Sequence, residues 1–239
     1  MRTERVEKRR SLLSKPWLWL SPSLAHRMSP AALNAINLIT SGSPPAWQSL
    51  EWRGLHFPNR LGIAGGVDKD ARNVKAWWTM GAGFLEVGTI TPQPQPGNTP
   101  PVVDRDTGHE ALWNRLGFPS QGADRVKLRL TELKRPFPAP VFANIGKNAS
   151  TPLESAHADY IELLRKLHGC VDGFVVNISS PNTKGLRDLL KPERLHGFCV
   201  RSWRNAWTPF CLSSVPTWRM RSWRGCSISR TTSISTVGS

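Results

Sequence analysis

Four apolar runs in this chain each stop abruptly at small or amide residues, and this repeated pattern limits the fold more than any other feature. The runs are 60–66, 83–89, 139–146 and 174–178. The last is typical of a parallel strand covered on both faces, because its β-branched residues are nearly continuous and Pro181 prevents further strand pairing. Helical patterns at 74–80 and 160–167 separate the runs. We therefore predict four strand–helix units in a parallel α/β sheet, open or closed into a barrel.

The residues at the ends of these runs indicate a ligand. The ends are 64–66, 88–89, 144–146 and 177–179, and they consist mostly of Gly, Ala, Asn, Ser and Thr. Glycine allows a flat ring or a phosphate to approach the backbone, and amides can bond to a heterocycle that has both donors and acceptors. The alternative is that these are ordinary polar turns with capping residues. Four such ends together favour a shared ligand at the carboxyl edge of the sheet.

Charge is concentrated near the two termini. The formal net charge is +15, of which residues 1–10 contribute +3 and residues 196–239 contribute +6. The middle of the chain is therefore an ordinary, mildly basic domain, and no nucleic-acid partner is expected for it. The four cysteines (Cys170, Cys199, Cys211 and Cys226) have no spacing typical of a metal site. They are compatible with a reducing compartment.

The N-terminal part has an amphipathic character. Residues 11–40 predict two short helices, the second beginning at the start signal Ser29-Pro30. The apolar stretch 12–24 is interrupted by Lys15, Pro16 and Pro22 and is too short to span a bilayer. The pair of helices can lie in a membrane interface, or it can cap the main domain with both apolar faces buried. Residues 46–60, with Gly54 at a turn, predict a small hairpin.

Five ordered motifs together resemble the class 2, quinone-linked branch of dihydroorotate dehydrogenase. They are Ile63–Lys69, Val87–Asn98, Asn114–Phe118, Asn144–Asn148 and Asn177–Thr183. The stretch Leu20–His26 also resembles the helical extension with which that family associates with membranes. The resemblance covers roughly residues 16–195.

This resemblance implies an FMN-dependent α/β chain of the (β/α)8 TIM-barrel type that oxidises dihydroorotate to orotate in pyrimidine biosynthesis and passes electrons to a membrane quinone. It divides the chain into a membrane-associating extension (1–45), the first half of the FMN-binding barrel (46–195) and a tail (196–239). The implied location is peripheral, on the cytoplasmic side of a bacterial inner membrane or, in a eukaryote, on the mitochondrial inner membrane.

The resemblance also assigns roles to individual residues. Ser180 matches the base that removes a proton from dihydroorotate, and it needs a route that passes this proton onward because a free serine is a weak base. Lys69 would balance the substrate carboxylate, although without the resemblance it reads as a solvated lysine between Asp68 and Asp70. The implied substrate contacts are Lys69, Asn114, Arg115, Leu116, Gly117, Phe118, Asn177 and Asn182. The implied FMN contacts are Ala64, Gly65, Gly66, Thr89, Asn144 and Asn177.

The sequence departs from the family pattern in two places. Val102 stands where the family usually has an arginine that lines the quinone tunnel. From about His196 the amino-acid composition changes: residues 196–239 contain six Arg, nine Ser and four Trp but no Lys, Asp or Glu. We read this tail as disordered or frameshifted, and we expect a half-barrel of four units to be unstable and to bind FMN weakly or not at all.

Two other functions remain open at this point. A basic protein whose Arg/Trp tail binds membranes or nucleic acid would use arginine on phosphates and tryptophan on bases, but no nucleic-acid-binding motif is visible. A different FMN barrel enzyme is limited by Ser180, because the cytosolic dihydroorotate branch is expected to have cysteine at that position.

Overall fold

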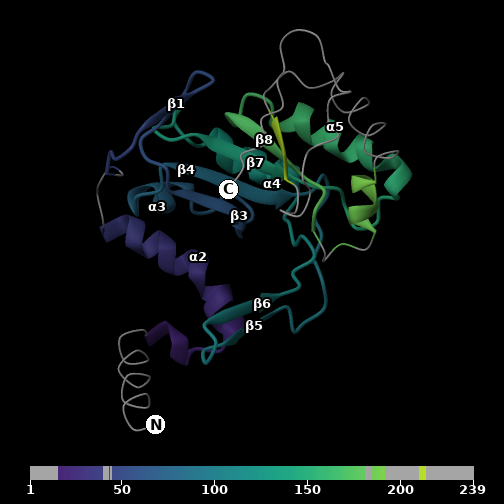
Figure 1. Ribbon diagram of the computed structural model, residues 1–239, viewed down its shortest axis with the longest axis horizontal. Coiled ribbons are helices and arrows are strands. Elements are labelled where there is room, and N and C mark those ends of the chain that lie inside the picture. Colours follow the sequence, from purple (N-terminus) through teal and green to yellow (C-terminus); the bar gives the residue numbers. More distant parts are fainter. Residues whose placement is uncertain are drawn as a thin grey trace.

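The centre of the molecule is a parallel sheet, as the sequence predicts. The computed structural model describes residues 16–39, 43, 45–180, 183, 185–191 and 210–213. Its main sheet has five strands in the order β3-β4-β7-β8-β9, and every neighbouring pair is parallel (Figure 1). The strands are β3 (Gly62–Asp68), β4 (Phe84–Ile90), β7 (Val141–Ile145), β8 (Gly173–Asn177) and β9 (Phe210–Ser213). The first four correspond to the four predicted strands.

Three helices cover one face of this sheet and enclose the core. They are α3 (Val74–Thr79), α4 (Ala123–Thr131) and α5 (Ala156–Leu167), and two short 3-10 turns, η2 (Leu153–Ser155) and η3 (Leu186–Leu190), accompany them. The core joins apolar residues of β4, β7 and β8 to the inner faces of these helices, and Tyr160 and Phe174 are its largest fully buried side chains. Burial of this kind is the main stabilising contribution in an α/β layer fold.

An antiparallel hairpin closes the amino ends of the strands, and it confirms the prediction for residues 46–60. It consists of β1 (Leu50–Trp52) and β2 (Leu55–Phe57). Gly54 forms the turn with φ of +78°, a conformation that favours glycine. The Phe57 ring lies 5.7 Å from the ring of Phe84 and 6.2 Å from that of Phe142, at the starts of β4 and β7. The carboxyl ends of the strands therefore face away from this hairpin.

Two features were not predicted from the sequence. The long segment between β4 and α4 contains an antiparallel hairpin of β5 (Val103–Asp106) and β6 (Ala111–Asn114). The strand β9 pairs with β8, although its stretch shows no strand period. Apart from β9, the tail 196–239 lies outside the described residues, so its predicted disorder or frameshift stays a prediction.

The N-terminal part differs from the predicted pair of helices. After a 3-10 turn, η1 (Pro16–Trp19), a single helix α2 runs from Pro22 to Ile39 and continues through Pro30. The Ser29-Pro30 pair does not start a new helix here. Pro30 has no N–H to bond to the carbonyl of His26, and a helix is normally interrupted at such a position. The hydroxyl of Ser29 donates to that carbonyl instead, at 2.9 Å. This bond satisfies the acceptor that proline leaves open, and the helix goes on.

The N-terminal extension is attached to the main body at two points, one on α2 and one just before it. The side-chain amide of Asn73, at the start of α3, donates to the carbonyl of Pro30 at 2.8 Å and to Oδ1 of Asn34 at 2.9 Å. On the hairpin side, the guanidinium of Arg105 in β5 donates to the carbonyl of Leu18 at 2.7 Å and also to that of Leu20. Figure 1 shows α2 and the β5–β6 hairpin together on one side of the sheet.

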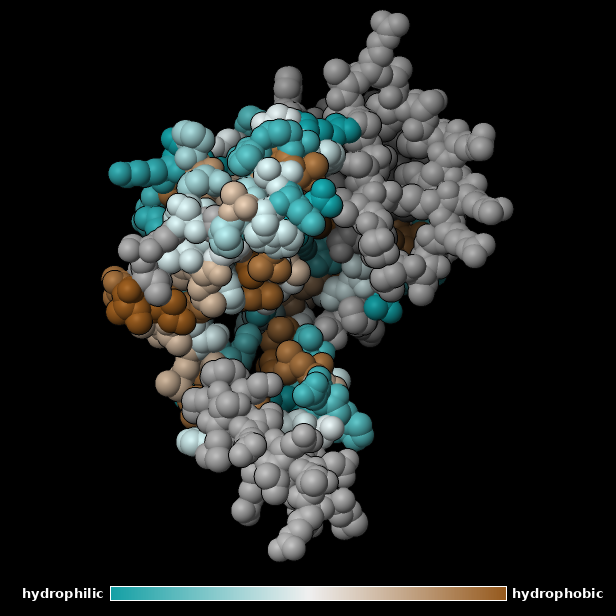
Figure 2. All heavy atoms as spheres, turned by 60° about the vertical axis from the view of Figure 1, so that its left-hand side comes forward, coloured by the Kyte–Doolittle hydropathy of each residue, from teal (hydrophilic) through white to brown (hydrophobic). Residues whose placement is uncertain are grey.

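Hydrophobic side chains remain exposed on this extension. Trp19, Met28, Leu38 and Ile39 are 64%, 50%, 85% and 83% exposed. Figure 2, which brings the left-hand side of Figure 1 forward, shows hydrophobic surface in several separate patches. Within the part of the chain that the structure describes, no helix is long and apolar enough to cross a bilayer.

Candidate functional site

Three polar side chains meet at the carboxyl ends of β4, β7 and β8, where the sequence predicts a shared ligand. The hydroxyl of Thr89 donates to Oδ1 of Asn144 at 2.6 Å. The amide of Asn177 donates to Oγ1 of Thr89 at 3.1 Å and to Oδ1 of Asn144 at 3.3 Å. Thr89 and Asn144 are buried and Asn177 is half-buried. We call Thr89, Asn144, Asn177 and their partner Glu86 the amide cluster.

Parallel pairing accounts for this meeting of side chains. Asn144 pairs with Val175 and Ile145 with Val176, so that Asn144 and Asn177 come to the same edge of the sheet. The hydroxyl of buried Tyr160 in α5 donates to the carbonyl of Asn177 at 2.9 Å and fixes the end of β8. Burial raises the pKa of Tyr160, so this hydroxyl keeps its proton and its role as a donor.

Glu86 completes the cluster, and sequence reasoning missed it. Its carboxylate accepts a hydrogen bond from the side-chain amide of Asn144 at 2.5 Å and another from the backbone N–H of Gly65. Burial raises the pKa of Glu86, and these two donors oppose that rise. The available signal was an acid in the middle of an otherwise apolar strand, which needs a partner wherever that strand is covered.

Glycine is required where the strands approach most closely. A Cβ added to Gly65 would lie 2.4 Å from Oε1 of Glu86 and 2.7 Å from Nδ2 of Asn144. Gly88 has φ of +126°, and a Cβ there would lie 2.2 Å from the carbonyl oxygen of Asn144. A larger residue at Gly65 would push the side chains of Glu86 and Asn144 aside, and one at Gly88 would collide with the backbone of β7.

Lys69 lies just beyond the end of β3. The strand bulges between Ile63 and Asp68, and the ammonium of Lys69 turns back to donate to the carbonyl of Gly66 at 2.8 Å. Burial lowers the pKa of Lys69, while Asp70 and Asp68 oppose that effect. The same cation contributes, after burial, to a lowered pKa of His26 in α2. Helix α2 therefore lies close enough for His26 to sense the charge of Lys69.

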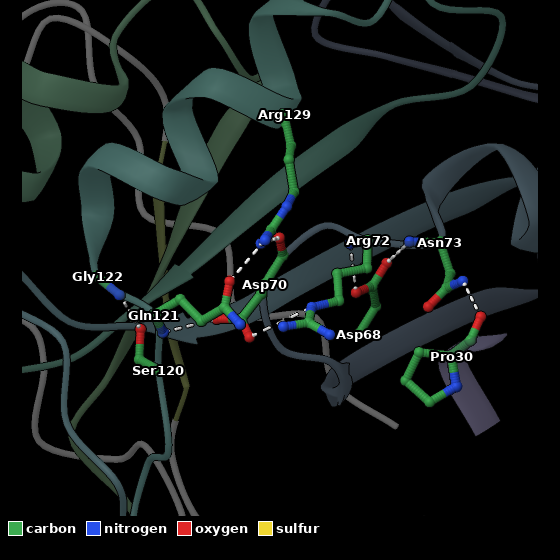
Figure 3. Close-up of polar contacts among 9 residues, drawn as sticks. All are labelled: Pro30, Asp68, Asp70, Arg72, Asn73, Ser120, Gln121, Gly122 and Arg129. Atoms are coloured by element: carbon green, nitrogen blue, oxygen red, sulfur yellow. Dashed lines mark hydrogen bonds and ion pairs between the residues drawn. The ribbon is translucent and has the colours of Figure 1, made fainter. Parts of the chain in front are cut away.

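The loop after β3 is fixed by buried Asp68. Its carboxylate accepts from the backbone N–H groups of Arg72 at 2.9 Å and of Asn73 at 2.8 Å. Burial raises the pKa of Asp68, and those two N–H groups oppose the rise. Figure 3 shows the resulting sequence of contacts from Asp68 through Asn73 to Pro30. The loop that carries Lys69 is thereby joined to the docking point of α2.

The predicted substrate loop, 114–118, is held mainly through its backbone. The side chain of Gln95 donates to the carbonyl of Phe118 at 2.8 Å and more weakly to that of Gly117 at 3.4 Å. The backbone N–H of Asn98 donates to the carbonyl of Leu116 at 3.0 Å, and its side-chain amide donates to that of Arg115 at 2.8 Å. These bonds give the loop a defined conformation.

Gln95 is itself fixed from the loop after β7. Its Oε1 accepts from the side-chain amide of Asn148 at 3.0 Å and from the backbone N–H of Ala149 at 2.9 Å. A Cβ on Gly146 would lie 2.6 Å from Cγ2 of Thr89 and 3.1 Å from Cε2 of Phe118. Phe118 therefore packs beside the amide cluster, and Gln95 connects this loop to the end of β7.

The structure brings together some predicted site residues and separates others. Gly65, Thr89, Asn144 and Asn177 meet directly. Ala64 and Gly66 lie beside Gly65 on β3, with Ala64 exposed. Asn114 is exposed at the end of β6. Ser180 is half-buried three residues beyond the end of β8, and Asn182 lies outside the described residues.

The side chain of Arg115 contacts the loop before β5. Its guanidinium donates to the carbonyls of Pro101 at 3.1 Å and Thr99 at 2.9 Å. The side chain therefore braces the loop before β5, while only its backbone belongs to the substrate loop. The described residues contain no group of three or more His, Cys, Asp or Glu arranged to hold a metal ion.

Comparisons with known proteins identify relatives of this chain. Residues 49–207 match the family model described as dihydroorotate dehydrogenase. A protein from Acidithiobacillus ferrooxidans named dihydroorotate dehydrogenase (quinone) is 44% identical over 77% of this chain and 53% of its own length. One of the same name from Thermus thermophilus is 51% identical over 68% of this chain and 47% of its own length. The chain thus spans about half the length of these relatives.

Solved structures show the same fold. The crystal structure of DHODH from Eimeria tenella in complex with ferulenol superposes with a TM-score of 0.71 at 31% identity, over 83% of this chain and 60% of that one. The ligand-free type from the same organism also gives 0.71, over 82% and 62%. These matches confirm the predicted α/β fold of TIM-barrel type, and the described strands form an open part of such a barrel.

Proposed function

Because the chain belongs to the dihydroorotate dehydrogenase family, we propose that it forms the first half of a quinone-linked enzyme that oxidises dihydroorotate to orotate in pyrimidine biosynthesis. The observation that carries this proposal is the amide cluster, in which hydroxyl and amide groups from three successive strand ends converge beside a loop that can hold a substrate. Carboxyl edges of parallel sheets are where α/β enzymes place their active sites. The alternative of a non-enzymatic nucleic-acid-binding protein has no support in the family match.

The donor set at the strand ends fits FMN. A flavin ring has one edge with alternating donors and acceptors, and Thr89, Asn144 and Asn177 offer both kinds of group. The neighbouring Gly66 leaves open space beside the strand end, because a Cβ there would meet no atom within 4 Å. We assign FMN contacts to Ala64, Gly65, Gly66, Thr89, Asn144 and Asn177. When bound, the flavin would supply the hydride acceptor.

Ser180 and Lys69 would serve the substrate. Ser180 would take a proton from dihydroorotate and pass it onward, which requires a relay because serine itself is weakly basic. Lys69 would balance the substrate carboxylate, and its partly buried position strengthens that interaction. Asn177, Asn182 and the loop 114–118 would orient the ring, with Asn114 as a positioning amide and Arg115 acting through its brace on the loop.

The extension would bring the enzyme to a membrane quinone. Exposed Trp19, Leu38 and Ile39 on η1 and α2 are suited to a bilayer interface, where apolar side chains leave water without crossing the membrane. We therefore propose peripheral association, on the cytoplasmic side of a bacterial inner membrane or on a mitochondrial inner membrane. Val102 is half-buried beside this region, so the quinone contact there would be apolar.

A chimera tests the assignment of the flavin site. Residues 1–195 of this chain would be joined to the remaining half of the Thermus thermophilus relative, and flavin content measured by absorbance after purification. We expect a folded protein with FMN bound, and we expect Asn177→Ala to lose most of that flavin. Asn114→Ala is the control, because it should keep its flavin and lose affinity only for orotate. A cooperatively folded chimera without flavin would contradict the proposal.

A further inference from the structure

A groove of about 580 Å³ opens at the start of α4, outside the amide cluster. Its walls come from the loop after β3, the loop after β4 and the first turns of α4. The lining residues are Arg72, Pro94, Gln95, Pro96, Ser120, Gln121, Arg125 and Arg129. Three of these are arginines and none is acidic. We call it the arginine groove, and the flavin and substrate assignments above use none of its arginines.

Arg129 is held in place by neutral partners. Its Nη1 donates to the backbone carbonyl of Asp70 at 2.8 Å, and its Nη2 donates to Oε1 of Gln121 at 2.5 Å. Gln121 is in turn fixed because its backbone N–H donates to Oδ1 of Asp70 at 2.9 Å (Figure 3). A guanidinium has five donor hydrogens, so these two bonds orient the group and leave donors for a ligand. Neither hydrogen-bonding group is charged, and the charge of Arg129 interacts with buried Asp68, whose raised pKa Arg129 opposes.

Of the other two arginines, Arg125 adds positive charge that no ion pair balances within the described residues. Arg125 precedes Arg129 by one helical turn, and like charges at this spacing repel each other along a helix. Within the described residues Arg125 forms no ion pair, and the neighbouring Asp124 pairs with Lys166 instead, at 3.0 Å. On the opposite wall, Nε of Arg72 forms a long ion pair with Oδ2 of Asp70, at 4.0 Å. An anion between the walls would relieve this repulsion.

We propose that the arginine groove binds a phosphate group carried by a small molecule or a lipid. Guanidinium groups bind phosphate oxygens through paired, charge-assisted hydrogen bonds, and three arginines match a ligand with several such oxygens. The positive end of α4, which starts at Ala123, adds to the attraction. A volume of about 580 Å³ is within the range of small-molecule sites, so the groove can take more than a bare ion.

The phosphate can come from two sources. Arg72 precedes Asn73, whose side chain holds α2 through the carbonyl of Pro30, so the groove lies near the extension with its exposed apolar residues. A lipid headgroup can reach the groove from a membrane on that side. A soluble phosphate ester needs no membrane at all. The proposal does not rest on the oxidation of dihydroorotate, because neither flavin nor substrate is needed for phosphate to bind.

Calorimetric titration of the full chain with inorganic phosphate at constant ionic strength tests the site. We expect saturable binding that weakens at least tenfold in the double variant Arg72→Gln/Arg125→Gln. Lys127→Gln is the matched control, because it removes one exposed charge from the same helix outside the groove. Arg125→Gln alone, at an exposed position, serves if the double variant does not fold. Equal affinity of the double variant and Lys127→Gln for inorganic phosphate would overturn the proposal.

Sedimentation with phosphatidylglycerol and phosphatidylcholine vesicles distinguishes the source. A lipid source predicts that the chain binds phosphatidylglycerol vesicles and that the double variant loses this binding while Lys127→Gln keeps it. A soluble source predicts phosphate binding in the calorimeter, with vesicle binding equal in the two variants. Calorimetry thus decides whether the site exists and sedimentation decides its source, and both results are independent of the flavin chimera.

Discussion

The side-chain amide of Asn144 donates to the carboxylate of Glu86 at 2.5 Å, and this bond sets the orientation of the whole amide cluster. Since the Nδ2 group of Asn144 faces Glu86, its Oδ1 faces Thr89 and Asn177. An acid in the middle of β4 therefore fixes the orientation of the side chains at the ends of β7 and β8.

Asn144→Ala should destabilise the chain by about 1–3 kcal/mol, because it leaves the partly buried carboxylate of Glu86 with one donor fewer and removes an acceptor from Thr89. Urea unfolding at pH 7 measures this change. The control is Asn114→Ala, an exposed position where the loss should stay within about 0.5 kcal/mol. Equal effects at the two positions would show that the amide cluster does not contribute to stability.

Glu86→Gln should change how stability depends on pH. Burial raises the pKa of Glu86 above its ordinary value of 4.5, so the folded chain binds this proton more tightly than the unfolded chain. The free energy of unfolding contributed by this group is therefore highest below pH 4.5 and falls as the pH rises through the raised pKa.

Urea unfolding of wild type and Glu86→Gln at several values from pH 4 to pH 7 checks this sign. Wild type should lose stability relative to the variant across that window. Asp68, whose pKa burial also raises, acts in the same direction in both proteins and cancels in the difference. A difference that is constant with pH, or that grows in favour of wild type, would show that Glu86 is not held in a desolvated state.

Gln95→Leu should loosen the substrate loop, because it removes the donor to the carbonyls of Phe118 and Gly117 and the acceptor for Asn148. Amide hydrogen exchange of residues 114–122 should become faster by about tenfold or more, in line with a local loss of about 1–3 kcal/mol. Gln93→Leu is the matched control, since the Gln93 side chain is exposed and only its backbone is bonded. Unchanged protection in Gln95→Leu would remove Gln95 from the loop's support.

Arg105→Ala should release the N-terminal extension from the β5–β6 hairpin, because the guanidinium holds the carbonyls of Leu18 and Leu20. Limited proteolysis should then cut between η1 and α2 faster than in wild type. Arg53→Ala is a suitable control, as Arg53 is exposed and lies over the ring of Trp52 on the other hairpin. Identical cleavage rates in the two variants would contradict this docking role.

The sheet and most of the cluster could be predicted because both follow from local patterns. Continuous apolar runs identified β3, β4, β7 and β8, and the small or amide residues after them identified Thr89, Asn144 and Asn177. Parallel pairing then necessarily brings those ends to one edge. The roles of Ser180 and Lys69 came from the family resemblance and remain predictions.

The remaining features depend on contacts between distant residues, which local patterns do not reveal. Helix α2 passes Pro30 because a neighbouring serine satisfies one carbonyl. Arg115 turns to the carbonyls of Thr99 and Pro101, sixteen and fourteen positions away. The β5–β6 hairpin forms within a proline-rich stretch where no alternation was visible. The role of Glu86 depends on its hydrogen bond with Asn144, which lies on the neighbouring strand β7.

The central claim is that this chain provides the catalytic serine of a dihydroorotate-oxidising site, and turnover by the flavin-loaded chimera tests it most directly. Dihydroorotate oxidation coupled to reduction of a soluble quinone should be measurable, and Ser180→Ala should lower kcat by at least about a hundredfold at pH 7. Ser155→Ala, a substitution at the start of α5, should leave turnover unchanged. A flavin-loaded chimera that fails to oxidise dihydroorotate, or that turns over equally well without Ser180, would contradict the account.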